Sequence, residues 1–142
     1  MTTTLALRIA SAISLLFTIG HSAGGLQKWS PNADNPVLRA MTDVHFDMMG
    51  MSRSYLDLYL GLGWSVSVAM LLQTVLLWQL ASLAGTEPAR VRPMIAAFLV
   101  ASLASGVIAW LLIFPVPVIF CAILSIALAV ACWTAGKATA AA

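Results

Sequence analysis

The charged residues of this chain are few, and they lie so unevenly that they leave three long uncharged runs. Residues 9–27, 58–86 and 93–136 contain no Asp, Glu, Lys or Arg, which makes runs of 19, 29 and 44 residues. Charged residues make up 8% of the chain, whereas soluble domains contain about 25%. A soluble globular domain and a disordered segment are therefore excluded, and the net charge of +2 is too small for a nucleic-acid-binding protein. The chain is predicted to be an integral membrane protein.

The lengths of the uncharged runs predict four transmembrane helices. A helix needs about 20 apolar residues to cross the roughly 30 Å of bilayer hydrocarbon, so each of the first two runs supplies one helix. The third run would be about 66 Å long as a single helix, and Pro115 and Pro117 at its middle would break it into two. We therefore predict an all-α membrane protein, a single membrane domain over residues 1–142, with four transmembrane helices in a bundle at about residues 5–25, 56–84, 93–114 and 117–135.

The basic residues predict the orientation of this bundle. With four crossings, both ends of the chain and the 85–92 loop lie on one side of the membrane. That side carries four Lys or Arg residues, and the other carries three, namely Lys28, Arg39 and Arg53. Because Lys and Arg favour the cytoplasmic side, we predict that both termini are cytoplasmic and that residues 26–55 face the periplasm or the cell exterior. The first span could also be read as a signal peptide, but it has no good small-residue cleavage site, so we expect a retained helix.

Small side chains recur every four residues on three of the predicted spans. In a membrane such side chains let helices approach closely, because lipid gives apolar helices no hydrophobic reason to associate. The repeats are Ala6, Ala10, Ser14, Thr18 and Ser22 on the first span, Ala97, Ala101 and Ser105 with Ser102 and Gly106 on the third, and Cys121, Ser125 and Ala129 with Ala127, Ala131 and Ala135 on the fourth. They predict close packing, either within one four-helix bundle or between the subunits of a homo-oligomer.

The segment between the first two spans is predicted to contain a short amphipathic helix at about residues 36–49. Asn35 is a typical N-cap, Pro36 is a typical first residue and Gly50 is a plausible stop. On a helical wheel the apolar residues share one face, which also includes His45, and the acidic residues share the opposite face. We expect this helix to lie across the end of the bundle or along the membrane interface.

Polar and aromatic residues are predicted to gather at the outer end of the bundle. Ser54 and Asp57 have the spacing of a capping box, so the second span begins there. An ionisable residue at the edge of a membrane span suggests a functional site, and convergent polar groups suggest a binding pocket. The candidate ligand-binding residues are His21, His45, Arg53, Asp57, Tyr59 and Trp64. The alternative is an Arg53–Asp57 ion pair flanked by the aromatic belt of the membrane interface.

Short motifs are spread over nearly the whole chain. They are His21-Ser-Ala-Gly-Gly25, Phe46-Asp-Met-Met-Gly50, Arg53-Ser-Tyr55, Gly61-Leu-Gly-Trp64 and Phe114-Pro-Val-Pro117. With these motifs the chain resembles a family of small, uncharacterised four-span bacterial integral membrane proteins. The resemblance implies the four-span architecture, and it makes the bacterial inner membrane the expected location. It implies no activity and no catalytic residue.

The motifs of several enzyme classes are missing from the sequence. The chain contains no P-loop and no G-x-S-x-G, H-E-x-x-H or C-x-x-C motif, which argues against nucleotide-driven work, zinc proteases and thioredoxin-like chemistry. No metal site is expected. A haem held by His21 and His45 is the one cofactor that the residues suggest.

Three functions remain open. The first, which we favour, is a module that binds a lipid or a small apolar molecule at the polar site on the outer end. The second is an accessory subunit or assembly factor that docks on a larger membrane complex. The third is a membrane enzyme for a lipid or sterol-like substrate, in which His21 or Asp57 exchanges a proton and Arg53 or Tyr59 stabilises the developing charge. The expected partners are membrane lipid and a second copy or a larger membrane complex, with no nucleic acid.

Overall fold

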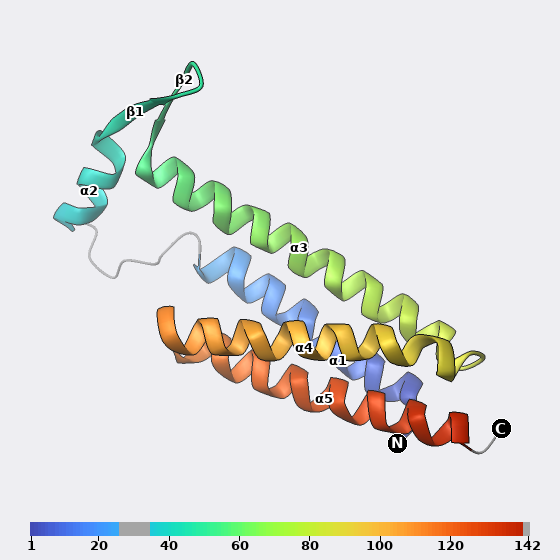
Figure 1. Ribbon diagram of the computed structural model, residues 1–142. Helices are drawn as coiled ribbons and strands as arrows, with labels where there is room; N and C mark the ends of the chain where they lie inside the picture. The colour runs from blue at the N-terminus through green and yellow to red at the C-terminus, as the bar shows by residue number, and fades with distance from the viewer. Residues whose placement is uncertain (26–34, 141–142) are drawn as a thin grey trace. The chain divides into compact units, whose positions relative to one another are not determined.

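The computed structural model of the protein describes residues 1–25 and 35–140, so Lys28 and Asp34 of the polar segment fall outside it (Figure 1). Four long helices dominate the described part: α1 (Thr3–Gly20), α3 (Tyr55–Leu83), α4 (Pro88–Leu112) and α5 (Pro115–Ala140). A π-helical turn, η1 (His21–Gly25), continues α1. Each long helix is apolar enough and long enough to cross a membrane, as expected of an integral membrane protein. The prediction of a predominantly helical chain with four membrane-length helices is thereby confirmed.

Prolines mark the first residues of the last two long helices, α4 and α5. Pro88 occupies the first position of α4, where its missing N–H leaves no hydrogen bond unmade. Pro115 disfavours helical backbone at Phe114 and cannot donate to a preceding turn, so α4 ends at Leu112 and α5 begins at Pro115. The 44-residue uncharged run is therefore two helices joined by Ile113 and Phe114, as predicted.

The chain divides into two compact units. Unit 1 comprises Met1–Phe17 and Met70–Ala142, and unit 2 comprises Thr18–Ala69. The core of unit 1 is formed by Ala6, Leu7, Ala10, Leu77, Leu80, Ala81, Ala84, Val91, Ile95, Leu124, Ala127, Leu128, Ala131 and Ala135. Half of these residues are alanines, which allow the close helix approach on which packing in a membrane depends.

Hydroxyl groups connect α1 to α3 inside unit 1. The hydroxyl of Ser14 accepts hydrogen bonds from Thr74 Oγ1 at 2.9 Å and from Gln73 Nε2 at 3.2 Å. The hydroxyl of Ser11 donates to the carbonyl oxygen of Thr74 at 2.9 Å. Ser14 belongs to the predicted repeat of small residues on α1, and Ala10 of the same repeat is fully buried. This face of α1 is therefore buried and hydrogen-bonded to α3 within unit 1.

Arg8 lies in the apolar part of α1 and finds its partners on α3. Its guanidinium lies 3.4 Å from the centroid of the Trp78 ring, and its Nη2 donates to Ser82 Oγ at 3.0 Å. Arginine stays charged in proteins, and the face of an aromatic ring attracts a cation. Trp78 and Ser82 therefore stabilise a charge that would otherwise lie among apolar helices.

Unit 2 contains a short helix followed by a β-hairpin. The helix, α2 (Pro36–Asp43), begins as predicted, because Asn35 Oδ1 accepts a hydrogen bond from the N–H of Val37 at 2.9 Å. After α2 the chain forms β1 (His45–Met48) and β2 (Met51–Ser54), which pair antiparallel with Met48 opposite Met51. Only two residues lie between the strands.

The predicted amphipathic helix at about residues 36–49 is wrong beyond Asp43. Met49 and Gly50 both have a positive φ, of 55° and 83°, and positive φ at both central residues is the mark of a tight hairpin turn. The N–H of Gly50 also donates to Asp47 Oδ1 at 3.0 Å. The glycine that looks like a helix stop is therefore part of a turn, and His45 is exposed on a strand instead of lying on the apolar face of a helix.

Replacing Gly50 by Ala should destabilise the hairpin by about 1–2 kcal/mol, since a Cβ in left-handed backbone has about that penalty. Met49→Asn creates Asn-Gly, the pair favoured in such turns, and should stabilise the hairpin. Hydrogen–deuterium exchange of the β1 and β2 amides should be faster in G50A and slower in M49N. Gly61→Ala is the control, because a Cβ there meets nothing within 4 Å. Equal exchange in G50A and G61A would contradict the assigned turn.

Candidate functional site

The six candidate residues from the sequence all lie in unit 2, at two places. Four of them lie on the hairpin and the first turns of α3, namely His45, Arg53, Asp57 and Tyr59, and Trp64 lies further along α3, three residues before Ser67. His21 lies on η1 and contacts Ser67, which is ten residues beyond Asp57 on α3. Ten residues of helix span about 15 Å, so His21 and Asp57 approach different levels of α3.

Ser54 and Asp57 form the predicted capping box at the start of α3. The N–H of Ser54 donates to Asp57 Oδ2 at 2.9 Å, and the N–H of Asp57 donates to Ser54 Oγ at 3.1 Å. These bonds satisfy donors that the first turn of a helix otherwise leaves unpaired. The carboxylate of Asp57 therefore has a structural role, although it remains exposed.

Arg53 and His45 both bond within their own hairpin segment. Arg53 Nη1 donates to the carbonyl oxygen of Ser52 at 3.0 Å, and its Nη2 contacts a methionine sulfur. His45 Nδ1 lies 3.1 Å from the carbonyl oxygen of Asp43. The alternative of an Arg53–Asp57 ion pair is not found in the described part of the chain.

Tyr59 and Trp64 point away from the interior of unit 2. Their side chains are 40% and 48% exposed on α3. Tyr55 is similarly exposed, and its ring packs on Phe46 with the centroids 5.0 Å apart. Outward-facing aromatic residues near the end of a long apolar helix are typical of a membrane-interface belt, which was the alternative explanation for these residues.

His21 takes part in a polar cluster between η1 and α3. Its Nδ1 lies 3.0 Å from the hydroxyl of Ser67, and the hydroxyl of Ser22 donates to Ser67 Oγ at 3.0 Å and to the carbonyl oxygen of Thr18 at 2.8 Å. π-Helical turns are frequent at functional sites, and a serine beside a histidine is a pair that nucleophilic catalysis uses. Ser67 is buried, however, and its hydroxyl also lies 3.4 Å from the carbonyl oxygen of Gly63, so it is shared by three partners. The cluster therefore fits a polar contact between helices better than an activated nucleophile.

The histidines set a limit on cofactor binding. Each uses Nδ1 in a hydrogen bond, so Nε2 is the ring nitrogen that either could offer to a haem iron. Within residues 1–25 and 35–140, no group of three or more His, Cys, Asp or Glu side chains is placed to hold a metal ion. The haem held by His21 and His45 stays a prediction.

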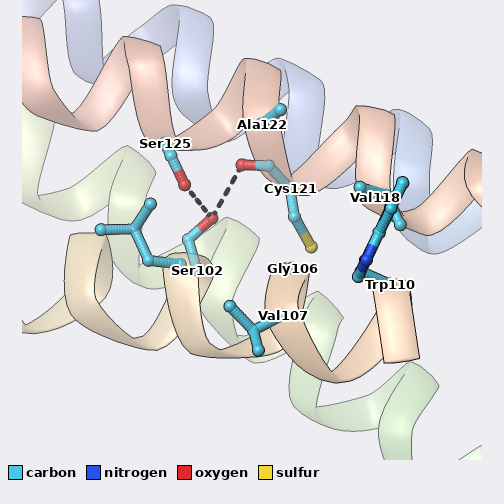
Figure 2. A pocket seen from close by; sticks show the side chains of 9 residues that line it. Ser102, Gly106, Val107, Trp110, Val118, Cys121, Ala122 and Ser125 are labelled. Carbon is cyan, nitrogen blue, oxygen red and sulfur yellow. Dashed lines mark hydrogen bonds between the residues drawn. The ribbon is translucent and has the colours of Figure 1, made fainter. Parts of the chain in front are cut away.

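A second candidate site lies in unit 1, where α4 and α5 run antiparallel (Figure 2). The hydroxyl of Ser125 on α5 donates to Ser102 Oγ on α4 at 2.9 Å, and the hydroxyl of Ser102 donates to the carbonyl oxygen of Cys121 at 3.2 Å. All three residues are buried. A Cβ at Gly106 would lie 3.2 Å from the Cβ of Cys121, which is tighter than most Cβ contacts, so the glycine helps the two helices to approach closely here.

An open groove accompanies this close contact between α4 and α5. Its volume is about 250 Å³. It is lined by Ser102, Leu103, Gly106, Val107, Trp110, Val118, Cys121, Ala122 and Ser125. Trp110 is 76% exposed, so the groove opens toward the surroundings of the unit. Small-molecule pockets usually measure about 300–1,000 Å³, so the groove suits a segment of an acyl chain or a small apolar molecule better than a large cofactor.

From the sequence, the small residues of this groove were predicted to serve helix packing and not binding. That prediction came from small residues spaced four apart on two successive helices, Ser102 and Gly106 on one and Cys121 and Ser125 on the next. Such steps predict that two helices meet. They do not show that a large neighbour such as Trp110 turns outward and leaves the space beside the contact unfilled.

No protein-family model matches the chain, no curated protein matches it, and no solved structure matches it. The resemblance to small four-span bacterial membrane proteins therefore stays a prediction.

Replacing Asp57 by Ala should destabilise the start of α3 by about 1 kcal/mol, as the loss of a capping side chain does. Asp57→Asn keeps a side-chain oxygen for the N–H of Ser54 and should have a smaller effect. Hydrogen–deuterium exchange at the first turn of α3 measures both changes. Arg53→Gln removes a neighbouring charge without touching the cap and serves as the control. An Asn variant as damaged as the Ala variant would show that the charge, and not the hydrogen bond, matters.

Ser102→Ala should destabilise unit 1 by about 1 kcal/mol, because it leaves the buried hydroxyl of Ser125 without its acceptor. Ser125→Ala should have a smaller effect, since Ser102 still donates to the carbonyl oxygen of Cys121. Reversible unfolding in mixed detergent micelles measures both. Ser105→Ala, at an exposed position of α4, is the matched control. If the double variant S102A/S125A lost more unfolding free energy than the two single variants lose together, this account would be contradicted.

Proposed function

We propose that this protein resides in the bacterial inner membrane and binds a lipid or another small apolar molecule in the α4–α5 groove. The observation that carries the proposal is an open groove beside the close helix contact at Gly106 and Cys121. Leu103, Val107 and Val118 supply apolar walls, and the indole of Trp110 supplies a flat one. The hydroxyls at the other end are already bonded to protein oxygens. The ligand is therefore selected by shape and apolar contact.

Competition with bulk lipid decides what such a groove can retain. A ligand gains no hydrophobic energy by moving from lipid tails into an apolar groove, because both surroundings are equally apolar. What it gains is the sum of many close contacts, each worth only about 0.1–0.2 kcal/mol. A rigid or ring-containing apolar molecule, which matches the flat indole of Trp110, is favoured over a flexible chain that loses rotational freedom on binding.

The proposed orientation follows from the ends of unit 1. The hydroxyl of Thr3 donates to the hydroxyl of Thr134 at 3.0 Å, so the start of α1 and the last turns of α5 meet at one end. The basic residues of unit 1 lie toward this end, namely Arg8, Arg90, Arg92 and Lys137. By the preference of Lys and Arg for the cytoplasm, both termini would be cytoplasmic.

An accessory subunit is the second candidate, and the hairpin favours it. Met48, Met49 and Met51 are 43%, 97% and 54% exposed at the turn between β1 and β2. Methionine is flexible and polarisable, and it is over-represented on surfaces that dock proteins. In this alternative the hairpin, including the candidates His45 and Arg53, would contact a larger membrane complex. The predicted polar binding site at the outer end and the enzyme for a lipid or sterol-like substrate have no comparable observation in their favour.

The groove proposal can be tested by filling the groove. Ala122→Phe places a large ring in the groove from α5, at an exposed position where it displaces no core residue. Both full-length proteins are extracted in mild detergent and measured by native mass spectrometry. The wild type should carry one co-purified apolar molecule that A122F lacks, and gas-phase release from the wild type identifies that molecule.

Ala104→Phe makes the same change at an exposed position of α4 that does not line the groove. It should retain the bound molecule as the wild type does. Equal retention by A122F, A104F and the wild type would overturn the groove as the binding site. Recovery of stoichiometric protein partners from native membranes, lost on Met49→Ser, would favour the accessory-subunit alternative.

A further inference from the structure

A second cavity lies at the end of unit 1 opposite the α4–α5 turn. It has a volume of about 480 Å³, and three separate parts of the chain form it: the first turn of α1, the connection from α3 to α4, and the last turns of α5. The residues that matter here are Thr2, Thr3, Thr4, Gly85, Thr134 and Lys137. Hydroxyl groups and the Lys137 ammonium supply the polar part of its lining, and Met1, Ala84 and Pro88 supply an apolar part.

The hydroxyl groups of this cavity are not all used by the protein. Thr3 donates to Thr134, and Thr134 donates to carbonyl oxygens of α5. Thr2 Oγ1 accepts from the N–H of Leu5 at 3.2 Å, which leaves its own proton free to donate. Thr4 makes no side-chain hydrogen bond within the described part of the chain. Thr2 and Thr4 therefore present two O–H donors to the cavity.

The charge in and around the cavity is positive. The ammonium of Lys137 lies 4.4 Å from the centroid of the Trp133 ring, and no carboxylate of the described residues pairs with it. The nearby acid on the α3–α4 connection, Glu87, is already bonded to Arg90 at 3.0 Å. An anion placed in the cavity would therefore meet the Lys137 ammonium and O–H donors, and no free carboxylate of that connection.

The depth of the cavity matches that of lipid phosphates. The membrane-length apolar segments begin or end at Thr3, Leu83, Pro88 and Lys137, which all border this end of unit 1. The apolar stretch of a span ends where the bilayer hydrocarbon ends. Headgroup phosphates lie just beyond that boundary, and basic pockets between transmembrane helices bind anionic headgroups.

We propose that this cavity binds a phosphate group, carried by the headgroup of an anionic phospholipid, between the Lys137 ammonium and the hydroxyls of Thr2 and Thr4. Lysine binds phosphate as a point charge, and the two O–H donors match acceptor oxygens of the phosphate. Such a site would be separate from the α4–α5 groove, since Lys137 lies about 18 Å along α5 from Ser125.

The test uses the full chain in a non-ionic detergent and measures thermal stability against added phosphatidylglycerol, phosphatidylcholine and inorganic phosphate. A ligand that binds the folded state raises its melting temperature as its concentration rises. We expect stabilisation by phosphatidylglycerol at lower concentrations than by phosphatidylcholine. Lys137→Gln should weaken the apparent affinity for phosphatidylglycerol about fivefold, the equivalent of about 1 kcal/mol per basic residue at a membrane surface. Lys137→Arg should restore most of it.

Arg39→Gln is the matched control, because Arg39 is exposed, lies in unit 2 and does not line the cavity. It should leave the phosphatidylglycerol response unchanged, whereas Thr4→Val should reduce it. Stabilisation by inorganic phosphate as strong as by phosphatidylglycerol, and lost in K137Q, would support the phosphate site but assign it to soluble phosphate. Equal responses of K137Q, R39Q and the wild type would overturn the site. The groove variant A122F should bind phosphatidylglycerol normally, so the two proposals can fail independently.

Discussion

Helices of such apolar composition cannot be held together in a membrane by the hydrophobic effect, so the structure depends on other interactions between the helices. Lipid tails are as apolar as leucine, so association depends on close packing and on hydrogen bonds between helices. Unit 1 uses both: alanines occupy half of its core, and the hydroxyls of Ser14, Thr74, Ser102 and Ser125 bond across helix pairs. Each hydroxyl also has to find a protein partner, because the hydrocarbon offers none.

The same constraint explains why the α4–α5 contact has an open groove. Close approach at Gly106 and Cys121 requires small side chains at the contact itself. The large residues of the same helix turns then lie to the side, and Trp110 projects outward instead of filling the space. In a soluble protein, water in such a groove would favour its collapse around apolar side chains. In a bilayer, lipid or another apolar molecule can fill it.

The sequence was informative where one physical rule dominates. The lengths of the uncharged runs and the prolines at 115 and 117 were enough to predict four membrane-length helices. The spacing of Ser54 and Asp57 was enough to predict the cap of α3. The segment after Asp43 was mispredicted because the apolar and polar residues of positions 44–49 are compatible with both a helix and a hairpin. The hairpin requires left-handed backbone at Met49, and a methionine in the sequence does not predict that conformation. The cavities could not be predicted, since an unfilled volume depends on side-chain directions and not on residue types.

Arg8 illustrates how one residue can restrict movement within a bilayer. Its guanidinium is held on α3 by the ring of Trp78 and by the hydroxyl of Ser82, which lie one helical turn apart. Sliding of α1 along α3 by even part of a turn would separate the charge from both partners and leave it in hydrocarbon. Within unit 1, a bilayer of different thickness would therefore be met by a change in tilt, and not by a change in the register between α1 and α3.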